Sequence, residues 1–142
     1  MWIYVQETGN MYQDVGGVLT FLANGYSGRG QYQNKPDAQC VKDYGPLPRG
    51  LYTFASPRAL NFMTDCLPLT PEAGTDMCNP ARAGFWIHDG IFSGPHGNSS
   101  HGCICLQRPA RLHMWASNDH QLKVVDADPE MDTSAPRKKS KG

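Results

Sequence analysis

Turn-forming residues divide this chain into short segments, and that feature constrains the fold more than any other. The 142 residues include 15 Gly and 11 Pro, which break helices and mark turns. Between these residues lie short β-branched and aromatic runs, which predict strands at residues 2–5, 18–23, 51–55, 84–88 and 122–125. The sequence therefore predicts a mainly β domain, that is, a β-rich α+β fold.

Helical spacing is clearest near the C-terminal end. Leu112, Trp115 and Ala116 recur at helical intervals after Pro109, and proline suits the first position of a helix. A single helical turn is predicted at residues 58–62. We therefore expect one substantial helix in a mainly β chain.

The chain shows no internal repeat and reads as one domain over residues 1–128. Residues 129–142 read as a disordered tail that ends in a basic cluster, Arg137-Lys138-Lys139-Ser140-Lys141. The 13 basic and 13 acidic residues give no net charge, which argues against a nucleic-acid partner held through phosphates. No apolar run is long enough for a membrane span, and the first residues show no secretory signal. We expect a cytosolic protein, or one exported without a cleavable signal.

The chain has an odd number of cysteines, five in all, so at least one is unpaired in a monomer. Cys66 and Cys78 flank a loop-like stretch at residues 67–74. In an oxidising compartment they would form a disulfide worth roughly 3 kcal/mol, and otherwise they are two ordinary half-buried thiols. Both interpretations stay open at this stage. The full set is Cys40, Cys66, Cys78, Cys103 and Cys105.

Residues 85–106 hold most of the chemically informative side chains, including three histidines and two cysteines. A thiol attacks a carbonyl readily once an imidazole takes its proton. Gly102 before Cys103 lets the backbone approach a substrate and can turn N–H groups toward a developing oxyanion. Serines in front of it can hold the turn in shape. Cys103 is therefore the candidate nucleophile.

Three other interpretations compete for the same residues. Cys103 can be an inert structural thiol, as most buried cysteines are. A phosphate-binding loop is excluded because no Lys-Ser or Lys-Thr follows the glycines. A zinc site is disfavoured because Cys-x-Cys is not the usual spacing of structural zinc ligands and no second pair exists; its ligands would be His88, His96, His101, Cys103 and Cys105.

A histidine at a strand end followed by Ser100-His101-Gly102-Cys103 resembles the signature of the L,D-transpeptidase catalytic domain. The resemblance implies an L,D-transpeptidase-like β-sandwich with the helix after the nucleophile. It makes Cys103 the nucleophile and His88 the base, with the imidazole oriented by the backbone carbonyl of Asp89. Ser100 and His101 would shape the pocket, and the amides of Gly102 and Cys103 would form the oxyanion hole.

Two features depart from the general family. Cys105 stands where an Arg or Asn is usual, and the interval between His88 and Ser100 is short, which leaves His96 as an alternative base. In both features the chain resembles the type VI secretion L,D-transpeptidase effector family. Three N-terminal motifs also look like that family: Gly25-Tyr26-Ser27-Gly28, Asn34-Lys35-Pro36 and Gly45-Pro46-Leu47-Pro48-Arg49-Gly50-Leu51-Tyr52.

The resemblance implies attack on the meso-diaminopimelate–D-alanine bond of peptidoglycan tetrapeptide stems, by hydrolysis or by D-amino acid exchange. It implies no metal and no cofactor, export by the type VI secretion machinery into a target periplasm, and a cognate immunity protein. Tyr26, Ser27 and Arg29 would line the cleft or form a structural turn. The alternatives are a papain-like peptidoglycan amidase, in which the cysteine precedes its histidine, and a non-catalytic metal or binding module with a structural Cys103.

Overall fold

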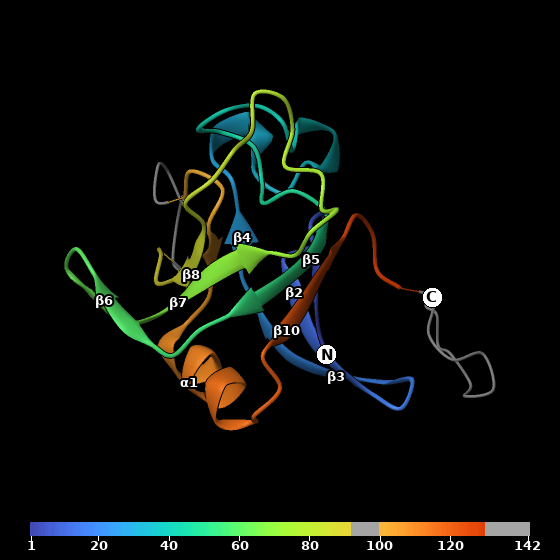
Figure 1. The fold of residues 1–142 in the computed structure, drawn as a ribbon, viewed down its shortest axis with the longest axis vertical. Helices are drawn as coiled ribbons and strands as arrows, with labels where there is room; N and C mark the ends of the chain where they lie inside the picture. The colour runs from blue at the N-terminus through green and yellow to red at the C-terminus, as the bar shows by residue number, and fades with distance from the viewer. Residues whose placement is uncertain (92–99, 130–142) are drawn as a thin grey trace.

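The computed structural model describes residues 1–91 and 100–129 (Figure 1). Over these ranges the chain is mainly β with one α-helix, as predicted. The helix α1 spans Arg108–Ala116, and two short 3-10 turns, η1 (Gly30–Tyr32) and η2 (Pro36–Ala38), follow β4. The strands are β1 (Trp2–Val5), β2 (Asn10–Val15), β3 (Val18–Asn24), β4 (Tyr26–Ser27), β5 (Gly50–Phe54), β6 (Arg58–Leu60), β7 (Met63–Pro71), β8 (Trp86–His88), β9 (Ile104–Cys105) and β10 (Gln121–Val125).

The strands pair in the order β3-β2-β1-β10-β5-β7-β8-β9-β4, with β6 paired to β7. The pairs β1–β10 and β8–β9 are parallel, and the other pairs are antiparallel. The first and last strands of this order, β3 and β4, are separated in the chain by Gly25 alone. The sheet must therefore curl until its two ends meet, and a Cβ at Gly25 would overlap the carbonyl of Cys105. Only glycine fits that corner.

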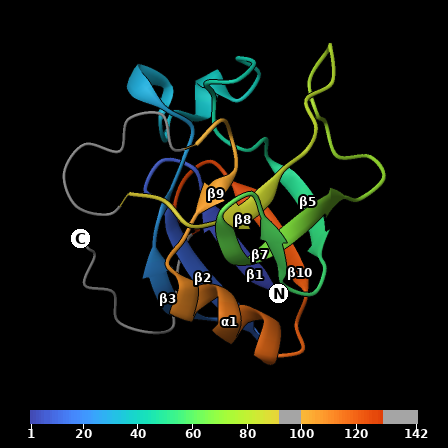
Figure 2. The same ribbon diagram turned by 90° about the vertical axis from the view of Figure 1, so that its left-hand side faces the viewer.

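The curled sheet encloses one apolar core (Figure 2). Successive side chains of a strand point to opposite faces of the sheet. Strand β10 alternates between exposed and buried residues over Gln121 to Val124, whereas all four residues of β1 are buried. Each fully buried large apolar side chain contributes roughly 1.5–3 kcal/mol. The main contributors are Trp2, Tyr4, Tyr52, Leu67, Ile87, Ile104, Met114 and Leu122.

Helix α1 packs across one end of the sheet through Met114 and is fastened by a buried arginine. The Arg111 Nε donates to the carbonyl of Asp65 at 2.9 Å, and its Nη2 donates to the carbonyl of Thr64 at 2.9 Å. The two 3-10 turns and the loop at residues 72–84 lie at the opposite end in both views (Figures 1 and 2). The helix therefore closes one end of the fold and loops close the other.

The strands predicted at residues 2–5, 18–23, 51–55, 84–88 and 122–125 and the predicted helix are confirmed within two residues at each end. The helical turn at 58–62 is wrong: β6 and β7 form a hairpin there, with Asn61 at a φ of 54°. The loop predicted at 67–74 is wrong over residues 67–71, where β7 runs to Pro71 and pairs on both sides, and is confirmed over residues 72–74. No sequence pattern predicted β2, in which Asn10, Gln13 and Asp14 are polar.

No helix in residues 1–91 and 100–129 is long and apolar enough to cross a membrane. The predicted tail lies outside the described residues from position 130 onward. His96, the alternative base, lies outside them as well.

Candidate active site

Parallel pairing of β8 and β9 brings the two halves of the predicted motif together. Ile87 is opposite Ile104 and His88 is opposite Cys105. Ile87 and Ile104 both face the core. The register of the two strands therefore fixes the position of His88 relative to Cys105. Cys103 precedes β9 directly, two residues from the position opposite His88. That offset corresponds to about 6.6 Å along the strands, so His88 and Cys103 stand at neighbouring positions along the same strand pair.

The His88 ring is buried and its proton position is determined by its neighbours. Its Nδ1 lies 2.5 Å from the carbonyl oxygen of Asp89. A carbonyl only accepts, so Nδ1 carries the proton and Nε2 presents the lone pair. Burial lowers the pKa of His88 below 6.5, and the charges of Arg111 and His101 lower it further against the opposing Asp89 carbonyl. The ring is therefore a neutral base at neutral pH.

The Cys103 sulfur is half-buried and accepts a hydrogen bond from the Trp86 amide at 3.3 Å. Burial raises the pKa of the Cys103 thiol to about 11, opposed by that amide and by the charge of Arg82. Cys103 is thus a thiol at neutral pH and needs a base. In the described part of the chain the Cys103 sulfur has its hydrogen bond with the Trp86 amide and none with the His88 ring.

Ser100 holds the turn in front of Cys103. Its hydroxyl accepts hydrogen bonds from the amides of Gly28 at 2.9 Å and Gly102 at 3.1 Å, and it donates to the Cys103 carbonyl at 2.6 Å. A hydroxyl offers one donor and two acceptor positions, so all three are used. Ser100 is fully buried and therefore shapes the site from within the fold.

Ser27 fastens the same turn from the other side. Its hydroxyl donates to the Gly102 carbonyl at 2.9 Å and accepts from the Leu47 amide at 2.8 Å. The motifs around residues 25–28 and 45–52 therefore meet at the Ser100–Cys103 turn. The two segments are far apart in sequence, and these hydrogen bonds explain why both accompany the cysteine motif.

Gly102 occupies a position where a Cβ would displace its neighbours. Its φ is +121°, and a Cβ there would lie 2.6 Å from the Arg82 Nη2 and 2.6 Å from the Phe85 ring. The Gly102 amide is committed to Ser100, which corrects the expectation that it points into an oxyanion hole. The Cys103 amide remains the candidate oxyanion donor.

The structure corrects two of the three predicted cleft residues. Tyr26 and Ser27 are 1% and 0% exposed, so neither lines an open cleft, and the Tyr26 hydroxyl accepts a hydrogen bond from the Ile91 amide at 2.8 Å. They belong to the structural turn that was the alternative interpretation. Arg29 is half-buried and lies 4.3 Å over the Tyr44 ring.

His101 and Asp89 are exposed beside the buried site residues. The His101 side chain borders a pocket of about 210 Å³. Asp89 uses its carbonyl for His88 and its Oδ1 for the Gly90 amide, at 2.9 Å. The pocket also touches Cys40, Lys42, Asp43, Arg82 and Phe85.

Cys105 fills the position where the general family has an Arg or Asn. Its sulfur is fully buried and lies 4.0 Å from the His88 Nδ1. Burial raises the pKa of Cys105 to about 12, opposed in part by a hydrogen bond with Tyr26. A Cβ on Gly90 would meet the Cys105 Cβ at 2.8 Å. The position is packed on all these sides and faces the interior.

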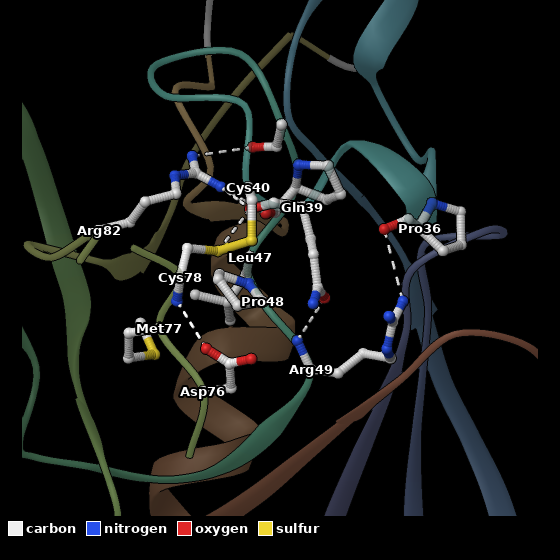
Figure 3. Close-up of a disulfide and its surroundings, with 12 residues drawn as sticks. Pro36, Gln39, Cys40, Leu47, Pro48, Arg49, Asp76, Met77, Cys78 and Arg82 are labelled. Atoms are coloured by element: carbon white, nitrogen blue, oxygen red, sulfur yellow. Dashed lines mark hydrogen bonds between the residues drawn. A yellow bond between two sulfur atoms is a disulfide. The ribbon is translucent and has the colours of Figure 1, made fainter. Parts of the chain in front are cut away.

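The disulfide joins Cys40 to Cys78 (Figure 3), and this corrects the predicted Cys66–Cys78 alternative. Cys66 is a fully buried free thiol in β7. Its side chain faces the core, whereas Cys78 lies in the loop at the other end of β7. The alternative of two free thiols is confirmed for Cys66 and wrong for Cys78, which is in the disulfide.

Arg82 lies at the site but carries no recognisable sequence signal. It lies between two alanines and no motif surrounds it. In the structure it is buried and donates to the carbonyls of Gln39, Gly45, Pro46 and His101. No sequence signal marks it because all four acceptors are backbone atoms, which every residue carries.

Among the described residues, no group of three or more His, Cys, Asp or Glu side chains is placed to hold a metal ion. The chain matches no curated protein and no solved structure. It matches the family model described as the Tlde1 domain over residues 22–128, which contain His88, Cys103 and Arg82. The match covers well over half of the chain and confirms the predicted membership of a type VI secretion effector family. The chain belongs to the Tlde1 family of antibacterial type VI secretion effectors.

Proposed function

We propose that this effector is a cysteine-dependent L,D-carboxypeptidase and L,D-transpeptidase. Its substrate would be the tetrapeptide stem of peptidoglycan, cut between meso-diaminopimelate and D-alanine. The observation that carries the proposal is the arrangement of two groups at the ends of adjacent parallel strands. These are a neutral His88 with its Nε2 lone pair available and a thiol at Cys103 on a turn held by Ser100.

The chemistry begins with proton transfer from the Cys103 thiol to the His88 Nε2. The sulfur attacks the carbonyl carbon of the diaminopimelate residue, and the carbonyl oxygen takes the negative charge. The Cys103 amide supports this oxyanion, since donors aimed at developing charge are worth several kcal/mol in a dry site. The carbon–nitrogen bond then breaks, His88 returns the proton to the leaving amine, and D-alanine departs from a thioester.

The thioester is resolved in one of two ways. Water, with His88 again as base, gives a tripeptide stem and the free thiol. The amine of a D-amino acid gives a new peptide bond and the same thiol. Both routes remove the terminal D-alanine, without which the stem cannot act as a donor in ordinary cross-linking.

The first proton transfer requires a rearrangement of the sulfur. Cys103 Sγ accepts from the Trp86 amide, so it must rotate toward His88 or transfer its proton through one water. Catalytic hydrogen bonds are often long before substrate binds. The high pKa of Cys103 fits this sequence, because it keeps the nucleophile protonated until substrate and base are in place.

The target and partners of this proposal follow from the effector family. The enzyme acts in the periplasm of a target cell after passage through the type VI secretion machinery. The producing strain carries an immunity protein that blocks the cleft. Arg29, half-buried beside Tyr44, and the exposed His101 are the proposed contacts to the stem.

The test is digestion of purified tetrapeptide muropeptides followed by mass spectrometry. We expect wild type to remove one alanine and to exchange it when another D-amino acid is present. Cys103→Ala and His88→Gln should be inactive, while Cys66→Ala, which removes a buried thiol outside the site, should remain active.

The same experiment separates the alternatives. A papain-like amidase would release the whole stem peptide instead of one alanine. A binding module would leave the muropeptides intact, and stoichiometric zinc in the purified protein would favour a metal role for the cysteines. Full activity in Cys103→Ala would end the proposal.

A further inference from the structure

Arg82 lies between the disulfide loop and the Cys103 turn. Its Nη1 donates to the carbonyls of Gln39 at 2.5 Å and Pro46 at 2.9 Å, and its Nη2 donates to Gly45 at 3.1 Å and His101 at 3.0 Å. Figure 3 shows the guanidinium beside the Cys40–Cys78 bridge. These acceptors come from three separate segments of the chain, and a planar guanidinium fork is suited to joining them.

The contacts of Arg82 use all four of its terminal N–H groups. A guanidinium in that state has no terminal donor left for the bidentate binding of a substrate carboxylate. Its acceptors are all neutral carbonyls, so the arginine is not neutralised by a contacting carboxylate. Its role is therefore to hold the backbone segments of its four acceptors together.

The turn at Cys103 depends on Arg82 from two sides. The His101 carbonyl accepts from Nη2, and Gly102 packs so closely that a Cβ would lie 2.6 Å from that nitrogen. The guanidinium also lies 5.1 Å over the Phe85 ring. Phe85 precedes Trp86, whose amide holds the Cys103 sulfur. Arg82 thus contacts both segments that border Cys103, through His101 and Gly102 on one and through Phe85 on the other.

We propose that Arg82 is a positioning residue for Cys103, which holds the His101–Gly102 peptide against the residues 45–46 and the Phe85 ring and so sets the place of the sulfur. This inference rests on the proposed function, in which Cys103 is the nucleophile. A nucleophile displaced by about 1 Å can lose roughly 100-fold in rate. The positive charge of Arg82 adds a second effect, because it lowers the pKa of Cys103 against the effect of burial.

The test uses Arg82→Lys, which keeps the charge but loses the fork, and Arg82→Met, which loses both. The matched control is Arg111→Lys. Arg111 is another buried arginine that donates to three carbonyls, those of Thr64, Asp65 and Leu106, but it makes no hydrogen bond to the Cys103 turn. The readouts are kcat and KM on tetrapeptide muropeptides, and the pH dependence of Cys103 alkylation by iodoacetamide, located by peptide mass spectrometry.

We expect both Arg82 variants to lose roughly 10- to 100-fold in kcat with little change in KM. The alkylation profile should move to higher pH in Arg82→Met and stay close to wild type in Arg82→Lys. Arg111→Lys should lower the melting temperature while keeping the wild-type alkylation profile. If either Arg82 variant does not fold, Gly102→Ala, which pushes the turn away from an intact Arg82, is expected to show the same loss of kcat.

Wild-type kcat in the folded Arg82 variants, together with an unshifted alkylation profile in Arg82→Met, would overturn the inference. So would an equal shift in Arg111→Lys, since it would show a general effect of lost stability, and so would unchanged kcat in Gly102→Ala. Failure of the proposed function gives a different result, namely wild-type protein that leaves muropeptides intact or an active Cys103→Ala. In that case the alkylation profile still reports whether Arg82 controls the thiol.

Discussion

Removing the Cys40–Cys78 bridge should cost this domain a large part of its stability. The two cysteines are 38 residues apart in the sequence. Closing a loop of that length reduces the entropy of the unfolded chain by about 13 cal/mol/K, which corresponds to about 4 kcal/mol at 25 °C. A domain of ordinary size is stable by only about 5–15 kcal/mol. The double variant Cys40→Ser/Cys78→Ser is therefore expected to fold but to be much less stable than the oxidised wild type.

The measurement is urea unfolding followed by tryptophan fluorescence, with and without a reductant. For a slope of about 2 kcal/mol/M, the midpoint should fall by about 2 M urea. Reductant should lower the wild type to the level of the double variant and leave the double variant unchanged. Cys66→Ala is the control, because it keeps the bridge and should still respond to reductant.

Equal midpoints for the oxidised wild type and the double variant would refute this reasoning. A bridge between Cys66 and Cys78 would also refute it, and peptide mapping of the unreduced protein distinguishes the two pairings. In that case Cys66→Ala would lose its response to reductant, whereas Cys40→Ser would keep it.

Two further predictions concern the site. Ser100→Ala leaves the buried amides of Gly28 and Gly102 without their acceptor. It should lower the free energy of unfolding by about 2–4 kcal/mol and remove most of the activity. Thermal unfolding tests this, with the exposed Ser56→Ala as control, and an unchanged melting temperature would contradict it. Because burial lowers the pKa of His88 below 6.5, the unfolded chain binds its proton first as the pH falls. The free energy of unfolding should therefore decrease below pH 6.5, and the acid limb of kcat/KM should lie below 6.5 as well. His88→Gln should remove that contribution to the stability profile, and an acid limb above 6.5 would argue against a buried neutral base.

Local patterns were enough to predict much of the fold. Strands β5 and β10 alternate as expected of half-buried strands, the aromatic and β-branched run of β1 is buried throughout, and Pro109 marks the start of α1. β2 escaped prediction because Asn10, Gln13 and Asp14 make it polar, and its neighbours β1 and β3 decide its conformation. Tertiary pairing overrides local propensity in such a strand.

The candidate site shows the same division between local and distant information. Cys103 and His88 stand in recognisable local contexts, and the contact between His88 and the Asp89 carbonyl joins adjacent residues. The Cys40–Cys78 pairing depends on how two loops meet at one end of the sheet. Five cysteines allow many pairings, and spacing alone cannot choose among them. Arg82 was invisible for a related reason, since its partners are backbone carbonyls that leave no trace in residue type.

Cys105 stands two positions after Cys103, where L,D-transpeptidases, which the motif resembles, usually have an arginine or asparagine. Cys105 is enclosed by Gly90, Tyr26 and the His88 ring, so the space holds a small side chain and would not admit a guanidinium. A cation is nevertheless present near the thiol, because Arg82 approaches from the loop before β8 and lowers the pKa of Cys103. Its four terminal N–H groups bind backbone carbonyls. Under the proposed function, recognition of the stem then falls to the exposed His101 and the half-buried Arg29.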